Sequence, residues 1–188
     1  MNRREAINRV AWIFGGAIIG SQLFLEGCTR PATTDVATLF EEDQINFLGD
    51  IADTILPPTG SPGAKEAGVG AFIPVMVRDC YTEEDQKVFL EGLNKLEESA
   101  NKKYKKNFQQ LSATERTDLL VEIDAEQNEY HSSKEPEQPN HYFRMIKQLT
   151  LLGFFTSELG ATKALRYNPI PGRYDGDYPY KKGDKAWA

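Results

Sequence analysis

The sequence predicts an all-α fold of about five helices, followed by an irregular tail rich in proline, glycine and tyrosine. Two observations support this prediction. Apolar residues recur at spacings of three and four along several segments, which is the pattern of a helix with one buried face. No segment alternates apolar and polar residues convincingly at the period of two that a half-buried strand requires. We expect residues 39–188 to form a single helical domain, preceded by a signal segment and a tether.

Residues 1–27 have the features of an export signal. Arg3 and Arg4 form a paired arginine, the mark of the twin-arginine translocase, which exports proteins already folded. The apolar stretch over 10–25 is only about 16 residues long, whereas a membrane-spanning helix needs roughly 20. This stretch therefore suits a signal peptide better than a membrane anchor.

A lipid-attachment site is predicted at the end of this signal. Leu25, Gly27 and Cys28 match a lipobox, in which small residues admit the signal peptidase and the cysteine is acylated. Glu26 is an unusual residue within that motif. We expect a protein on the periplasmic side of the cell envelope, anchored to a membrane by lipid on Cys28, with residues 28–38 as a flexible tether.

Charge and cysteine content exclude several classes of function. The formal net charge is -6, and an acidic chain lacks the basic stripe that nucleic-acid binding needs. The same charge argues against attachment to anionic lipid by electrostatics alone. Cys28 and Cys80 are the only cysteines, so acylation of the first leaves no internal disulfide, and we expect Cys80 to be a small buried side chain.

The first helix is predicted to begin near Thr38 and to end at Pro57-Pro58. Thr38 and Glu41 are candidates for a capping box, and the two prolines end the helix because neither donates to its hydrogen-bond ladder. The apolar residues that share its buried face are Ile45, Leu48, Ile51, Ala52 and Ile55.

A loop over 59–70 separates the first helix from the second. It carries Pro62-Gly63, the pair favoured at the centre of a type II turn. The second helix is predicted over 71–80, with Pro74 in its first turn, where a proline is tolerated.

Two further helices are predicted from their caps. Thr82 is the expected cap of a long surface helix that is acidic at its start and basic at its end, the order that complements the helix dipole. Ser112 and Glu115 form the best capping box of the chain and begin the next helix. A polar linker is then expected from about Gln127 to Pro139. The thin apolar stripe of the long helix is Phe89, Leu93, Leu96, Ala100 and Tyr104.

The last major helix is predicted over His141 to Leu159, with Asn140 as its cap and Gly160 as its stop. Apolar residues lie on several of its faces, so we expect it to be buried nearly all round. The tail beyond it holds five aromatic rings that either lie back on the helical core or face a partner, and the sequence leaves both interpretations open. These rings belong to Tyr167, Tyr174, Tyr178, Tyr180 and Trp187.

The sequence contains few groups that could carry chemistry. It has no glycine-rich nucleotide loop, no nucleophile elbow and no Cys-x-x-Cys motif. His131 and His141 are the only histidines, and no cysteine is placed to complete a zinc site with them. Asp50 and Asp53 resemble a carboxylate pair, although the polar face of the first helix explains them more simply. We therefore predict no catalytic residue, no metal site and no cofactor on this chain.

Several sequence blocks point to a known family. They read DTILPPT at 53–59, SPGA at 61–64, AGV at 67–69, FI at 72–73, LTLLGFFTS at 149–157 and YNPIPG at 167–172. Together they resemble the gluconate 2-dehydrogenase subunit 3 family, over most of positions 40–178. None of these motifs is catalytic.

The resemblance implies a small accessory subunit of a flavin-dependent sugar or polyol dehydrogenase of the glucose-methanol-choline type. In such complexes FAD and substrate lie on the large subunit, and electrons leave through a cytochrome c subunit or the quinone pool. The small subunit supplies the twin-arginine signal and stabilises the large one. Cys28 departs from the plain signal of many members, which leaves open whether a cytochrome is still needed as the anchor. The alternative is a free-standing envelope lipoprotein that acts as a binding or scaffold module.

Two irregular segments are the predicted contacts with the large subunit. The loop over 57–70 and the tail over 167–180 are rich in proline and glycine, so each can hold a fixed shape and lose little entropy on binding. The alternative is that both merely close the helical core. The candidate contact residues are Pro62, Gly63, Pro171, Gly172, Tyr174 and Tyr178.

Overall fold

The computed structural model describes residues 39–170 and 172–187, and this part of the chain is all-α, as predicted. Its only β-type pairing is an isolated bridge between Arg166 and Trp187. The predicted export and lipidation residues, Arg3, Arg4 and Cys28, lie outside the described residues. The elements are α3 (Glu42–Ile55), α4 (Val69–Cys80), α5 (Glu83–Tyr104), the 3-10 turn η1 (Phe108–Gln110), α6 (Ala113–Ser133), α7 (Tyr142–Thr156) and the π turn η2 (Gly160–Ala164).

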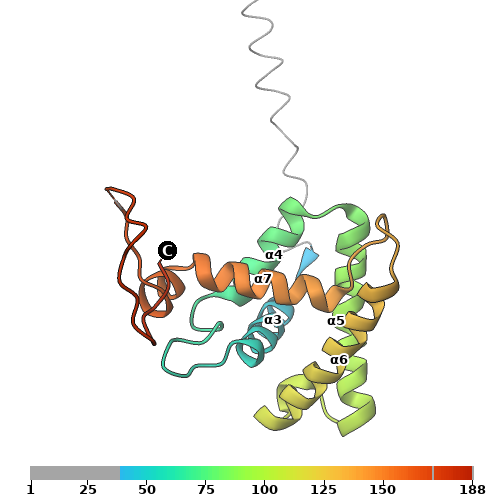
Figure 1. Cartoon of the computed structure of the whole chain (residues 1–188). Helices are drawn as coiled ribbons and strands as arrows, with labels where there is room; N and C mark the ends of the chain where they lie inside the picture. The colour runs from blue at the N-terminus through green and yellow to red at the C-terminus, as the bar shows by residue number, and fades with distance from the viewer. Residues whose placement is uncertain (1–38, 171, 188) are drawn as a thin grey trace, which may run out of the picture. The chain divides into compact units, whose positions relative to one another are not determined.

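Helix α7 is the centre of the packing. It contacts α3, α4, α5 and α6, and Figure 1 shows it lying across α3 and α4 and reaching the pair formed by α5 and α6. The core that these helices share is fully buried at its largest side chains, among them Leu48, Ile51, Ile73, Phe89, Leu96, Phe108, Phe143 and Ile146. None of the helices between residues 39 and 187 is long and apolar enough to cross a membrane.

The caps predicted at Thr82 and at Ser112 with Glu115 are confirmed. The Asp85 N–H donates to Thr82 Oγ1 at 3.2 Å, at the start of α5. Ser112 and Glu115 exchange two hydrogen bonds, of 2.8 Å and 3.3 Å, at the start of α6. The apolar stripe of α5 is also confirmed, because Phe89 and the other predicted positions up to Ala100 are buried.

The first two helices begin at other residues than predicted. Helix α3 begins at Glu42, and its cap is Glu41, whose N–H donates to Gln44 Oε1 at 3.0 Å. Helix α4 begins at Val69, because Gly68 takes a left-handed conformation with φ of 76° and caps it. Pro74 therefore lies in the second turn of α4 and is buried, rather than in the first turn.

Helix α6 continues to Ser133, so the linker predicted from Gln127 starts several residues too early. Gln127 is buried, which shows that this polar segment still packs against the fold. The prediction for Cys80 is also wrong, since its side chain is exposed at the end of α4.

The two ends of α7 differ from the prediction as well. Its cap is His141, not Asn140, because the Phe143 N–H donates to His141 Nδ1 at 3.3 Å. The helix ends at Thr156, before the predicted Leu159. Gly160, the predicted stop of this helix, instead begins η2, and its N–H donates to Ser157 Oγ at 2.9 Å.

Candidate functional site

The loop after α3 is held by two carboxylates of that helix. Asp53 Oδ1 accepts a hydrogen bond from the Lys65 backbone N–H at 3.2 Å. Asp50 Oδ1 forms an ion pair with Lys65 Nζ at 2.6 Å and lies 3.9 Å from Arg116 Nη1 of α6. Asp50 and Asp53 thus order the loop, a role beyond the polar helix face that the sequence suggested.

The predicted type II turn at Pro62-Gly63 is wrong. Such a turn needs a positive φ at Gly63, and this glycine is not among the described residues with positive φ. Gly63 is instead buried where a Cβ would overlap Asp53 Oδ1 and lie 2.9 Å from Pro58 Cδ. The close approach of two packed groups therefore explains the glycine, and Pro62 beside it is half-buried.

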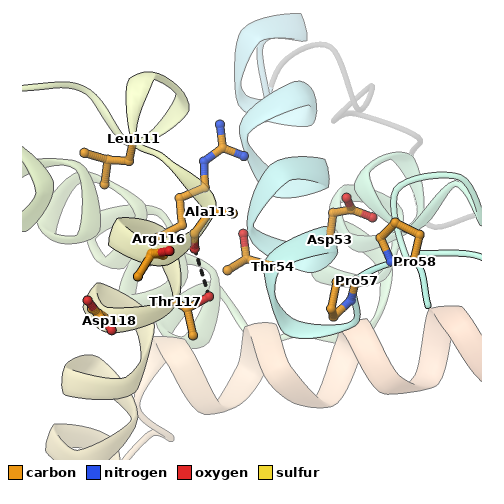
Figure 2. Close-up of a pocket in the computed structure, with 10 residues that line it drawn as sticks. Asp53, Thr54, Pro57, Pro58, Leu111, Ala113, Arg116, Thr117 and Asp118 are labelled. Atoms are coloured by element: carbon orange, nitrogen blue, oxygen red, sulfur yellow. Dashed lines mark hydrogen bonds between the residues drawn. The ribbon is translucent and has the colours of Figure 1, made fainter.

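An open cleft of about 780 Å³ lies between this loop and the start of α6. Figure 2 shows Thr54, Pro57 and Pro58 on one side and residues of α6 on the other. Two hydroxyl groups of its wall are already engaged, since Thr54 Oγ1 donates to Asp50 O at 2.8 Å and Thr117 Oγ1 donates to Ala113 O at 2.9 Å. Asp53, Arg116 and Asp118 add charged groups to the same lining, so the wall is mixed in character.

The tail is ordered around Arg166. Its backbone N–H donates to Ala186 O at 2.8 Å, and its guanidinium lies 4.4 Å from the centre of the Trp187 ring. Arg166 also pairs with Asp184 at 3.8 Å, and Tyr178 packs edge-on against Trp187 at 5.4 Å. The tail therefore closes on itself, and its five rings are not among the side chains that pack against the hydrophobic core.

The predicted contact residues of the tail differ in exposure. Tyr174 is 95% exposed, whereas Tyr178 is 51% exposed and belongs to the Arg166 cluster. Gly172 is exposed with a φ of 70°, and Pro171 lies outside the described residues. Among these residues, Tyr174 is the ring that offers a partner the most surface.

One face of α7 is apolar and exposed, which corrects the prediction that this helix is buried nearly all round. Leu151, Leu152 and Phe155 are 42%, 44% and 40% exposed. Phe155 lies one turn after the adjacent Leu151 and Leu152, and all three belong to the LTLLGFFTS block. Periodicity did not separate this face from the buried one, because both are equally apolar.

The loop, the exposed face and the tail are connected through one end of α7. A Cβ on Gly153 would overlap the ring of Phe72, so the first turn of α4 packs directly on the last turns of α7. The loop over 57–68 leads into that turn of α4, and the tail departs from the same end of α7. Figure 1 shows the tail beyond this end of the helix.

Charge divides the described chain into two parts. The helices over 39–160 carry 12 Lys or Arg and 22 Asp or Glu, whereas the segment over 161–188 carries 6 and 3. Within the residues that the structure describes, no group of three or more His, Cys, Asp or Glu side chains is placed to hold a metal ion. The exposed apolar face of α7 and the basic tail therefore belong to a helical body that is itself acidic.

Comparison with known proteins identifies the family. The family model for gluconate 2-dehydrogenase subunit 3 matches residues 42–172, a range that contains the loop, the exposed face of α7 and the first part of the tail. No curated protein and no solved structure matches the chain significantly. The chain therefore belongs to the gluconate 2-dehydrogenase subunit 3 family.

Proposed function

We propose that this chain is the non-catalytic small subunit of a flavin-dependent sugar or gluconate dehydrogenase of the glucose-methanol-choline type. Membership of the family supports an accessory role in a dehydrogenase complex. In the proposed complex FAD and substrate lie on the large subunit, which this chain stabilises. The observation that carries the proposal is the exposed apolar face of Leu151, Leu152 and Phe155, because three large apolar side chains gathered on one helix face favour a partner.

We propose that the large subunit covers this face together with the neighbouring loop and tail. The loop contributes Pro57 and Pro58, which are exposed and held by an ordered backbone. Tyr174 contributes an exposed ring of the type that often anchors an interface. Because the loop is already ordered, its docking loses little conformational entropy. Pro62 and Gly63 then act mainly by holding the loop in shape.

Export and anchoring form the second part of the proposal. Arg3 and Arg4 would direct the folded subunit, with its bound flavoprotein, to the twin-arginine translocase. Lipid on Cys28 would then hold the complex at the periplasmic side of a membrane, with or without a cytochrome c subunit. A Cys28→Ser variant should leave the membrane pellet for the soluble envelope fraction. Unchanged retention in the pellet would assign the anchoring to a partner or to an uncleaved segment.

Affinity purification from the native host tests the docking face. Leu151→Asp with Phe155→Asp places two charges on the proposed interface, and Val121→Asp is the matched control on α6, where Val121 is 62% exposed. The wild type and the control should retain the flavoprotein, visible as flavin absorbance at about 450 nm, and the double variant should lose it. Circular dichroism melts should be alike for all three proteins.

Two outcomes would contradict the proposal. Retention of the flavoprotein by the double variant would exclude this face as the interface. A wild-type protein that purifies without any flavoprotein would favour the alternative of a free-standing envelope lipoprotein.

A further inference from the structure

The two histidines of the chain meet at the joint between α6 and α7. His131 lies near the end of α6, and His141 is the cap of α7. The His141 backbone N–H donates to His131 Nε2 at 3.4 Å, and the Phe143 N–H donates to His141 Nδ1 at 3.3 Å. Each imidazole thus accepts a hydrogen bond from an N–H group that the start of a helix leaves without an intrahelical partner.

Both hydrogen bonds require a neutral imidazole ring. A neutral imidazole has one acceptor nitrogen, whereas the protonated ring has two N–H donors and no acceptor. The network therefore assigns the Nδ1–H tautomer to His131 and the Nε2–H tautomer to His141. The Nε2 atom of His141 lies 3.7 Å from Glu126 Oε1 of α6. Protonation of either histidine removes one of the two bonds.

Aromatic packing connects this joint to α5. The Tyr130 ring lies 5.5 Å from His131 and 5.7 Å from His141, measured between ring centres. Tyr142 packs against His141 at 4.4 Å and is only 5% exposed. On α5, a Cβ at Gly92 would overlap the Tyr142 ring. A change at the joint is therefore transmitted to the contact between α5 and α7.

The charged groups around the joint disfavour protonation of His131. Burial lowers its pKa from the ordinary value of 6.5, and the positive charges of Arg144 on α7 and Lys134 after α6 lower it further. The positive end of the α7 dipole acts in the same direction on a cation placed at the start of this helix.

The surroundings of His141 contain charges of both signs. Burial is the largest influence and lowers its pKa below 6.5; Glu126 opposes this change, and His131 and Lys95 of α5 add to it. Glu91 of α5 also faces the joint, across a cavity of about 310 Å³ that reaches His141. The net effect keeps both imidazoles neutral in the folded protein at neutral pH.

We propose that His131 and His141 form an acid-sensitive latch on the amino-terminal end of α7. With both rings neutral, the two backbone N–H groups are bonded and Tyr142 is held against α5. In acid, proton uptake breaks these bonds and places positive charge at the start of α7. The first turn of α7 then opens, and Tyr142 loosens from Gly92.

The direction of the pH dependence follows from linkage. A histidine whose pKa is lower in the folded protein contributes stability that is present above its ordinary pKa of 6.5 and is lost as the pH falls through the lowered value. The latch is therefore closed above about pH 6.5 and opens progressively below it.

Hydrogen exchange on the detergent-solubilised full-length protein tests the latch. Between about pH 7.5 and pH 5, protection factors at the amides of His141 and Phe143 should fall about tenfold after correction for the intrinsic exchange rate. The amides of Ile51 and Ala52 in α3 serve as the internal reference and should change much less. Equal falls at both places would overturn the proposal, because the whole domain would then be losing stability together.

Two variants separate the latch from the titration of carboxylates elsewhere. His131→Gln with His141→Asn keeps acceptor atoms that do not titrate, so the fall in protection should disappear. Glu126→Gln removes the group that raises the pKa of His141, so the fall should move to lower pH. A double variant with the wild-type pH response would overturn the proposal.

A measurement on the wild type is independent of these substitutions. Nitrogen-15 spectra of the imidazole rings should show the Nδ1–H tautomer for His131 and the Nε2–H tautomer for His141, with both rings titrating below 6.5. The opposite tautomers, or titration above 6.5, would overturn the latch.

Discussion

The loop over 57–68 and the tail over 166–187 are both rich in proline and glycine but are held in different ways. The loop is fixed to the helical body, by Asp53 bonded to the Lys65 backbone and by Asp50 paired with the Lys65 side chain. The tail is fixed mainly to itself, by Arg166 with Ala186, Asp184 and Trp187. Proline and glycine content therefore predicts irregular structure, but not whether that structure contributes to the stability of the domain.

A side chain at Gly63 should produce the largest difference between the two segments. Gly63→Val would force a Cβ into Asp53 Oδ1 and Pro58, and we expect a loss of about 2–3 kcal/mol in the free energy of unfolding. Gly60→Ala is the control within the loop, because nothing lies within 4 Å of its Cβ position. Urea denaturation followed by circular dichroism measures both, and equal stabilities would show that the loop is not fixed to the body.

The carboxylate that anchors the loop should have the next largest effect. Asp53→Ala removes the acceptor of the Lys65 backbone N–H, and we expect a loss of about 1–2 kcal/mol. Lys65→Ala breaks only the ion pair with Asp50, in which Lys65 is 52% exposed, and should cost less than about 1 kcal/mol. Denaturation midpoints check this order, and a larger effect of Lys65→Ala would assign the anchoring to the ion pair.

Opening the tail should hardly affect the stability of the domain. Arg166→Ala removes the partner of Trp187 and Asp184, yet the unfolding free energy should change by less than about 0.5 kcal/mol, because the tail rings lie outside the core. Limited proteolysis should cut within 167–185 much faster than in wild type. Arg173→Ala, whose side chain is 87% exposed, should leave the cleavage rate unchanged. A lowered melting temperature would assign the tail to the core.

The smallest effect on stability is expected at Tyr174. Tyr174→Ala removes a ring that is 95% exposed, so the melt should stay as in wild type while flavoprotein retention weakens, by about 2 kcal/mol if the ring is an anchor. Tyr178→Ala is the comparison, because it also disturbs the packing against Trp187 and should increase proteolysis of the tail. Full retention by the Tyr174 variant would remove this ring from the interface.

The sequence predicted the helices well where local chemistry determines them. Thr82 and Ser112 cap their helices through hydrogen bonds to residues three positions away, and Pro57-Pro58 follows the end of α3. These signals act within a few residues, and at these three places the rest of the fold leaves them unchanged.

The failures concern properties that depend on distant residues. A glycine is required at position 63 because Asp53 of α3 and Pro58 at the start of the loop both approach it closely. The cap of α7 is a histidine stabilised by the end of α6. Leu151 and Phe155 are as apolar as the core, so only the structure shows that no described part of the chain covers their face. Apolar periodicity therefore cannot distinguish an exposed docking face of this chain from a buried face.

The pairing of Arg166 with Ala186 and Trp187 has a consequence for the entropy of the tail. It joins the two ends of a segment of about 20 residues, and closing a flexible loop of that length costs about 2.7 kcal/mol or more at 25 °C. This chain entropy is lost when the subunit folds, before any partner binds. Tyr174 is therefore presented on a closed loop rather than on a free strand. Truncation before Ala186 removes both partners of Arg166 at the end of the tail, so it should weaken partner binding by restoring this chain entropy, even though the ring of Tyr174 is untouched.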